Sequence, residues 1–249
     1  MGRRVGKGSI TLGNDNFVAD FDKMFPELPP GNIYVALTGG VESTIVYHLV
    51  LKYYGPQVVI PTTYRFGDRR QWEFTNAKRI AGLYGQGDVH REAGYMESFS
   101  QRVIDTSSTV KYFNRENNVF RKIRMQDPAF VAGFTGKNTT TLDPECITPE
   151  EQQHYLVNYN IHRPLLLMNK VHTVDMYYKL GLESLLKQTY SCQQGGAVHC
   201  GDCHACWERV DAFNQLGRRD VVLYKGDYDM ISHQVAEFFR TRWPTKEAK

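Results

Sequence analysis

The sequence predicts an α/β protein built on a doubly wound parallel sheet, and three observations favour that class. Two short apolar runs, at residues 33–37 and 58–64, are each followed by a segment with helical periodicity. The first run, IYVAL, has no polar alternation, as expected for a strand that is buried on both faces. A length of 249 residues with 41% hydrophobic residues allows one sizeable core of this kind.

The first strand and helix are marked clearly. Residues 33–37 form the apolar run, and the stretch 38–40, Thr-Gly-Gly, breaks it. Ser43 is then expected to cap a helix whose apolar residues recur with helical spacing. Gly55 is a natural stop for this helix, because glycine adopts the left-handed conformation that follows a helix end.

The rest of the sheet follows the same alternation. Residues 58–64 are predicted as the second strand, and a helix is expected over about residues 69–84. Residues 95–126 look mainly helical, and residues 129–134, AFVAGF, are predicted as another buried strand. Residues 135–160 are rich in Thr, Pro and Glu and are expected to form a long loop.

The chain is expected to have three parts. Residues 1–30 contain several glycines and prolines and are predicted as an irregular N-terminal extension. Residues 31–185 would form the α/β domain, and residues 186–249 a C-terminal metal-binding and helical lobe. Three helices are predicted near the C-terminus, at about residues 171–180, 207–216 and 231–243.

Four of the five cysteines lie within fifteen residues with the spacing C-x7-C-x2-C-x2-C, namely Cys192, Cys200, Cys203 and Cys206. A C-x2-C pair presents two thiolates on a tight turn, and four such sulfurs complete the tetrahedral coordination of a structural zinc ion. His199 and His204 are substitute ligands by chemistry, but four cysteines already fill four positions. An iron–sulfur cluster or redox-active thiols are the alternatives.

Charge and hydropathy exclude several classes of protein. The net charge is only +3, from 30 basic and 27 acidic residues, too small to indicate a nucleic-acid or membrane surface. No apolar run approaches the roughly 18 residues that a membrane span needs. The basic N-terminus is followed by no apolar region, so no secretory signal is expected. We therefore expect a soluble cytoplasmic protein.

The loop after the first strand is the first candidate site, and it comprises Leu37, Thr38, Gly39, Gly40, Val41, Glu42, Ser43 and Thr44. It lies at the carboxyl end of a strand, where doubly wound sheets bind their ligands. Glycines let a phosphate approach the backbone, and a helix N-terminus favours an anion. Glu42 could hold Mg²⁺ against the phosphates. The spacing matches neither a Walker A loop nor G-x-G-x-x-G, and a tight turn with a serine cap is the alternative explanation.

The hexapeptide TGGVES resembles the S-G-G-x-D-S loop of the PP-loop ATP pyrophosphatase superfamily, whose members adenylylate a substrate and release pyrophosphate. The segment from Cys192 through the W-E-R that follows Cys206 is very similar to the zinc segment of the 7-cyano-7-deazaguanine synthases. Residues 66–70, FGDRR, and residues 164–170, PLLLMNK, resemble two further stretches of that family. The motifs occur in the family order over roughly residues 31–217.

The loop departs from the family in two positions. Thr38 stands where the family has serine, which keeps the hydroxyl, and Glu42 stands where it has aspartate, which moves the carboxylate by one methylene. The family also has a Gly-Arg-Asn element that the chain lacks, and residues 114–125 are the candidate replacement. Gly136-Lys137-Asn138 stands where the family shows an acidic substrate loop.

The resemblance implies ATP-dependent conversion of 7-carboxy-7-deazaguanine and ammonia into 7-cyano-7-deazaguanine, with ATP, Mg²⁺ and Zn²⁺ as cofactors. It implies that the loop glycines and Ser43 hold pyrophosphate and that Glu42 acts through Mg²⁺. Lys170 would supply positive charge to the phosphates. Arg69 would contact phosphate or the substrate carboxylate, and a solvated helix start is the alternative for this residue.

The implied partners are small molecules, with no membrane and no direct nucleic-acid contact, and a homodimer is compatible with the family. Two other functions stay open. A degenerate PP-loop could bind nucleotide or a partner without catalysis, and a related enzyme could act on another deazapurine or on a nucleic-acid base.

Overall fold

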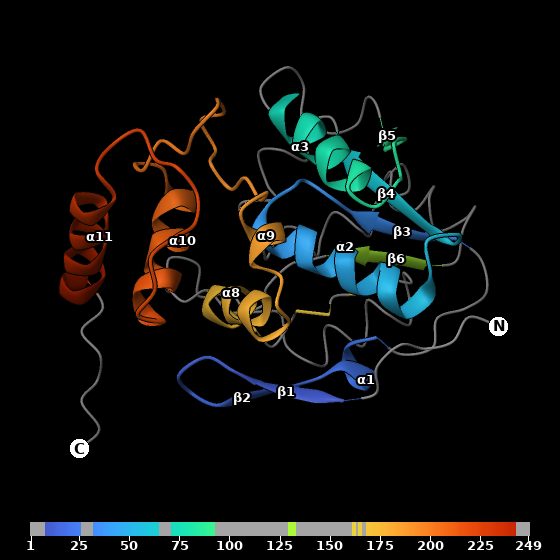
Figure 1. The fold of residues 1–249 in the computed structure, drawn as a ribbon, viewed down its shortest axis with the longest axis horizontal. Helices are drawn as coiled ribbons and strands as arrows, with labels where there is room; N and C mark the ends of the chain where they lie inside the picture. Colours follow the sequence, from blue (N-terminus) through green and yellow to red (C-terminus); the bar gives the residue numbers. More distant parts are fainter. Residues whose placement is uncertain are drawn as a thin grey trace.

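The computed structural model describes residues 8–25, 32–64, 71–92, 129–132, 161–162, 164–165 and 168–242. Its centre is a five-stranded parallel sheet with the strand order β5-β4-β3-β6-β7 (Figure 1). The strands are β3 (Ile33–Ala36), β4 (Val59–Tyr64), β5 (His90–Glu92), β6 (Ala129–Ala132) and β7 (Ile161–His162).

The strand order agrees with the predicted α/β sheet, in which the chain moves outward from one central strand in both directions. From β3 the chain builds outward to β4 and β5, then returns to the other side of β3 for β6 and β7. The direction therefore reverses between β3 and β6. Ligands of doubly wound sheets bind outside the carboxyl ends of the strands at such a switch point. The loop that follows β3 begins there.

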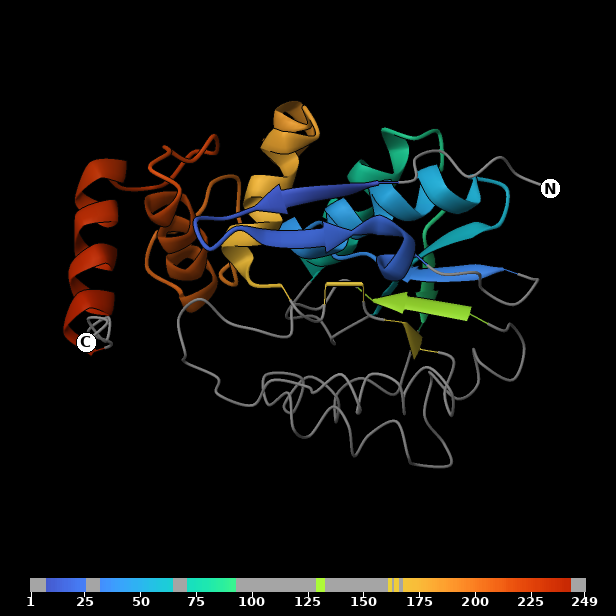
Figure 2. The same ribbon diagram turned by 90° about the horizontal axis from the view of Figure 1, so that it is seen from below.

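Helix α2 (Val41–Tyr54) connects β3 to β4, and helix α3 (Gln71–Gly82) connects β4 to β5. Both crossovers run in the same direction along the sheet, and right-handed crossovers then place both helices on one face, as Figure 2 shows. Nearly every residue of α2 is buried, because the helix also packs against α8 (Lys170–Lys179) on its outer side. Such a helix is buried on most of its surface rather than on a single face.

The expected element positions agree with the structure apart from small shifts at the ends. Helix α2 ends at Gly55, which has a φ of +88° and donates its amide to the carbonyl of Leu51. We expected Ser43 to be the N-terminal cap of α2, but the cap is Gly40. The segments 95–126 and 135–160, predicted as helical and as a loop, lie outside the described residues.

Residues 8–25, the described part of the predicted extension, are not irregular, contrary to our expectation. Strands β1 (Ser9–Leu12) and β2 (Phe17–Asp20) form an antiparallel hairpin, and the short helix α1 (Phe21–Met24) follows. Leu12 and Ala19 are buried, and β1 packs against α8. Each strand is only four residues long, too short for alternation to be recognised, but the turn residues Gly-Asn-Asp-Asn at 13–16 are a typical hairpin signal.

The C-terminal part is helical, with α8, α9 (Glu183–Leu186), α10 (His204–Gln215) and α11 (Tyr228–Arg242). Helix α10 packs between α8 and α11 (Figure 1). One buried apolar cluster runs from β3 and α2 through α8 to Ala212 and Phe213 of α10, so α8 and α10 share the core of the sheet. Helix α11 packs on α10 in a separate cluster around Ile231 and Val235. No helix in the described part of the chain is long and apolar enough to cross a membrane.

Candidate functional site

The glycine-rich loop turns sharply between β3 and α2. Gly39 has a φ of +81°, and a Cβ atom there would lie 2.5 Å from the Cβ of Asn76 on α3. Both facts demand glycine at this position. Gly40, the N-terminal cap of α2, has no side chain to satisfy the first amides of the helix. These amides point out of the carboxyl edge of the sheet, where an anion would be favoured.

Ser43 organises this loop from inside the helix. Its hydroxyl accepts the amide of Thr38 at 3.2 Å, lies 3.1 Å from the Thr38 hydroxyl and donates to the carbonyl of Gly40 at 3.4 Å. Ser43 therefore holds the turn closed instead of capping the helix. Thr44 Oγ1 is fully buried and has no hydrogen-bond partner among the described residues.

A lysine from a distant helix reaches the same loop. Lys170 is the first residue of α8, and its Nζ lies 3.0 Å from Oε1 of Glu42 and 2.9 Å from Oε2 of Glu208 on α10. All three side chains are at most 20% exposed. The structure thus brings together two of the predicted catalytic residues, Glu42 and Lys170, beside the loop.

The charges in this cluster stabilise one another. Burial alone lowers the pKa of Lys170, but the carboxylates of Glu208 and Glu42 outweigh burial and raise it above its usual value. Burial raises the pKa of Glu208, but the nearby charges of Lys170 and His204 outweigh it and lower this pKa. One ammonium between two carboxylates leaves a local charge of −1, so the cluster can accept a further cation or release Lys170 to an anionic ligand.

Glu208 is a member of this cluster that was not predicted from the sequence. It lies 38 residues from Lys170 and 166 residues from Glu42, so no local spacing connects the three. The sequence feature that could have indicated Glu208 is the W-E-R motif directly after the last cysteine. The predicted contact Arg69, its neighbour Arg70 and the replacement segment 114–125 lie outside the described residues.

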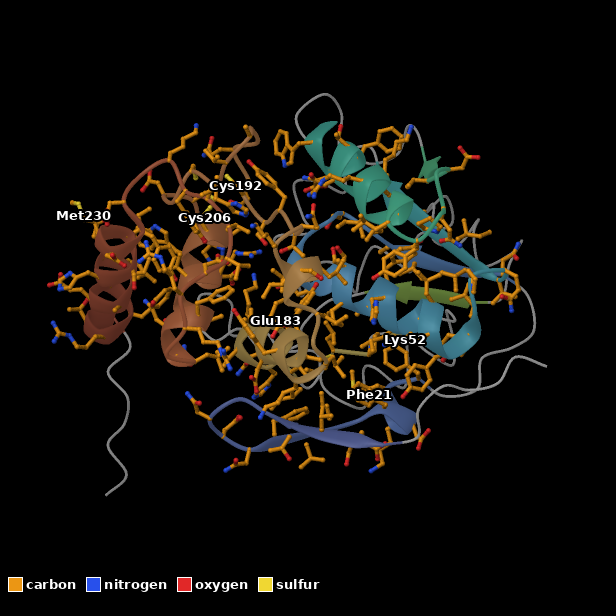
Figure 3. The ribbon with its side chains drawn as sticks, viewed as in Figure 1. Phe21, Lys52, Glu183, Cys192, Cys206 and Met230 are labelled. Atoms are coloured by element: carbon orange, nitrogen blue, oxygen red, sulfur yellow. The ribbon has the colours of Figure 1, made fainter. Side chains whose placement is uncertain are left out.

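The four predicted cysteines come together at the start of α10, where Figure 3 shows the labelled Cys192 and Cys206. Their Sγ atoms all lie within 4.8 Å of one another, and all four thiols are free of disulfides. A tetrahedral zinc ion with Zn–S bonds of about 2.3 Å spaces its sulfurs about 3.8 Å apart. The distance between the Sγ atoms of Cys200 and Cys206 is 3.9 Å. The four residues therefore fit such an ion.

Backbone amides support the sulfurs. The amides of Asp202 and Cys203 point to Sγ of Cys200 at 3.4 and 3.3 Å, and the amide of Gln193 points to Sγ of Cys203 at 3.4 Å. Hydrogen bonding with the Cys206 thiol and with this Gln193 amide lowers the pKa of Cys203. Donors of this kind favour the thiolate, which is the form that binds metal.

The two histidines beside the cysteines belong to no metal-binding group among the described residues. His199 is buried, and its Nε2 accepts the amide of Ser191 at 3.1 Å. Burial, with the nearby charge of Arg209, lowers the pKa of His199 to about 4. The ring is therefore neutral at physiological pH and acts as a packing and hydrogen-bonding group.

Comparisons with known proteins agree with this arrangement. The family model for queuosine biosynthesis protein QueC matches residues 146–217, which include all four clustered cysteines and Glu208. The 7-cyano-7-deazaguanine synthase of Clostridium kluyveri is 23% identical over 78% of this chain and 97% of its own length. The synthase of Oceanobacillus iheyensis is 26% identical over 76% of this chain and 96% of its own length.

A shorter stretch is more similar. The 7-cyano-7-deazaguanine synthase of Paracoccus denitrificans is 44% identical over 50 residues, 20% of this chain and 21% of its own. Among solved structures, the tRNA thiolase NcsA of Methanococcus maripaludis aligns with a TM-score of 0.44 at 11% identity, over 88% of this chain and 76% of its own. The family model and the relatives that are matched over nearly their whole length show that this chain is similar to the QueC family.

Proposed function

We propose that the protein is an ATP-dependent ligase that converts 7-carboxy-7-deazaguanine and ammonia into 7-cyano-7-deazaguanine. The similarity to proteins that are named 7-cyano-7-deazaguanine synthases supports this proposal. The observation that carries the proposal is the position of the glycine-rich loop at the switch point, with Lys170 against it. That arrangement offers donors and positive charge to a phosphate chain.

The chemistry proceeds by two activations of one carbon. A carboxylate resists attack by ammonia because oxide is a poor leaving group. Transfer of AMP from ATP to the carboxylate forms a mixed anhydride and releases pyrophosphate, and ammonia then displaces AMP to give the amide. Transfer of a second AMP to the amide oxygen, followed by loss of AMP and two protons, gives the nitrile.

The loop residues have distinct roles in this proposal. The backbone at Gly39 and Gly40 and the hydroxyls of Ser43 and Thr38 bind the pyrophosphate part of ATP. Glu42 is the ligand for Mg²⁺, which neutralises phosphate charge when it is bound. Lys170, whose ammonium lies between Glu42 and Glu208, would contribute positive charge to the phosphates if Glu42 held the cation. Arg69 remains the proposed contact for the substrate carboxylate.

The cysteines hold Zn²⁺ in a structural role. Four thiolates fill the coordination sphere, so no position remains open for catalysis. We further propose a sheet of the PP-loop type, small-molecule substrates without direct nucleic-acid contact, a cytoplasmic location and a homodimer.

A mass-spectrometric assay tests the activity. The purified protein is incubated with ATP, Mg²⁺, ammonium and 7-carboxy-7-deazaguanine, and we expect the nitrile with AMP and pyrophosphate. Product that stops at the amide would show that only the first activation operates. A folded, zinc-loaded protein that forms no AMP would contradict the proposal and would favour a binding module or another substrate.

A further inference from the structure

One segment contacts both the glycine-rich loop and the cysteine cluster. This segment, residues 188–195, is called the tether below; it leads from α9 toward α10 and contains Cys192 (Figure 1). The backbone amide of Tyr190 in the tether donates to the carbonyl of Gly39 at 2.8 Å. Because Gly39 also packs tightly on Asn76 of α3, the turn of the loop is held between the tether and α3.

The tether rests on the same helix that supports the loop. The guanidinium of Arg79 on α3 donates to both the side-chain and the backbone oxygen of Gln188. At the other end, a Cβ atom on Gly195 would lie 2.9 Å from Cε3 of Trp72. Helix α3 therefore aligns the tether at both of its ends.

The conformation of the tether depends on the cysteine cluster. The amide of Gln193 donates to Sγ of Cys203, and the amide of Ser191 donates to Nε2 of His199. The ring of Tyr190 lies 4.6 Å from the ring of His199, centroid to centroid. The buried guanidinium of Arg209, two turns after Cys203, donates to the hydroxyl of Thr189 at 2.7 Å.

We propose that metal binding at the four cysteines and phosphate binding at the glycine-rich loop are coupled through the tether. With metal bound, the sulfurs hold the tether in the conformation in which the Tyr190 amide restrains Gly39. Without metal, the sulfurs lose their common partner, the hydrogen bonds to Cys192 and Cys203 weaken, and the loop amides are no longer aligned. The coupling rests on the proposed function in one respect, namely that the loop binds the phosphates of a nucleotide.

Calorimetric titration of Mg²⁺-ATP into the zinc-loaded and the chelator-treated protein, without deazapurine, tests this coupling. We expect ATP to bind about 5- to 150-fold more weakly to the metal-free protein, the usual range of coupling between two sites. Linkage then requires saturating ATP to raise the affinity for zinc by the same factor, as measured by competition with a chelator. Amide hydrogen exchange at residues 39–43 should be faster without metal even when no nucleotide is present.

A pair of variants separates the coupling from loss of the metal. Gly195 and Gly196 both have positive φ, of 68° and 113°, but only a side chain at Gly195 meets Trp72. We expect Gly195→Ala to keep one zinc ion per chain and yet to weaken ATP binding several-fold, because it displaces the tether from α3. Gly196→Ala, the matched control with open space around the site, should bind ATP as the unaltered chain does.

The outcomes distinguish the two proposals. Equal ATP affinity of the folded zinc-loaded and metal-free proteins would overturn the coupling and leave the proposed function intact. Failure of the zinc-loaded protein to bind ATP would overturn both. If circular dichroism shows that chelation unfolds the chain, the variant pair decides, and equal affinities of Gly195→Ala and Gly196→Ala would overturn the coupling.

Discussion

At the scale of single residues, the ammonium of Lys170 matters most, because it separates the carboxylates of Glu42 and Glu208. Removing one partner of a buried ion pair leaves an uncompensated charge and costs about 3 kcal/mol or more. We expect Lys170→Met to lower the free energy of unfolding by about this amount in urea titrations. The double variant Lys170→Met/Glu208→Gln should recover part of the loss.

Lys179, exposed at the other end of the same helix, is the matched control for this prediction. Lys179→Met should leave the free energy of unfolding within about 0.5 kcal/mol of the unaltered chain. A Lys170→Met protein as stable as this control would show that the three charges do not interact in solution.

Asp211 on α10 makes the stability depend on pH. Burial raises the pKa of this carboxyl to about 6 from an ordinary value of 3.8, although Gln215 donates to it at 2.7 Å. A raised pKa in the folded state means that the native protein binds the proton more tightly than the unfolded chain. Stability from this group is therefore complete below pH 3.8 and declines as the pH rises through about 6.

The variant Asp211→Asn keeps an oxygen for Gln215 and removes the charge. We expect it to be more stable than the unaltered chain at pH 7, by about 3 kcal/mol for a pKa rise from 3.8 to about 6 at 1.36 kcal/mol per pKa unit, and nearly equally stable near pH 4. Urea unfolding at the two pH values measures both. A difference in stability that does not change with pH would contradict the assignment.

At the scale of elements, the N-terminal hairpin is an integral part of the fold. Asp15 contacts Nε2 of His172 on α8 at 2.8 Å, and the ring of Phe17 stacks on the same imidazole at 4.7 Å. Gly13, with a φ of +67°, donates its amide to Asp175 and approaches His172 so closely that a Cβ atom would lie 2.6 Å from its Cδ2.

We expect Gly13→Ala to detach the hairpin from α8, which limited proteolysis would detect as early cleavage near the N-terminus. Gly85→Ala is the matched control, because Gly85 has a similar φ of +73° but open space around it. Backbone strain alone costs about 1 kcal/mol in both variants. Equal protease resistance of the two proteins would argue against tight docking of the hairpin.

An element can be predicted from the sequence when neighbouring residues determine its structure, and not when contacts between distant segments do. Strand β3 is predictable from its continuous apolar run, and helix α2 from apolar residues with helical spacing and from Gly55, which ends the helix. The cysteine cluster was predicted from spacing alone. The predicted N-terminal cap of α2 was wrong, because the Ser43 hydroxyl accepts the amide of Thr38, which precedes the helix. The conformation of the turn, and not the residue type alone, determines this contact. The contact of Glu208 with Lys170 depends on how α8 packs on α10, which no local pattern reports.

At the scale of the whole molecule, one apolar core joins the sheet to the helices that follow it. The predicted boundary between the α/β domain and the C-terminal lobe lies between residues 185 and 186, and unfolding experiments test whether the two parts are independent. We expect a single cooperative thermal transition, because separation of α8 and α10 would expose the shared core. Two resolved transitions would support two independent domains instead.

Loss of the metal is expected to lower the melting temperature of this cooperative unit. The variant Cys203→Ser should lose zinc, measured by elemental analysis, and should melt at a lower temperature than the unaltered chain, because a structural metal contributes directly to the free energy of folding. A variant that lost the metal and kept its full melting temperature would contradict the structural role.

The strand order also has a consequence for synthesis on the ribosome. Strand β3 can pair with β4 soon after both emerge from the ribosome. The other edge of β3 stays unpaired until β6 is made, at residues 129–132. The growing chain therefore carries an open edge during that interval, which is a site for incorrect pairing. The amide of Tyr190, which restrains Gly39, arrives later still. The restraint on the glycine-rich loop therefore forms only after residue 190 has been made, long after the loop itself has emerged.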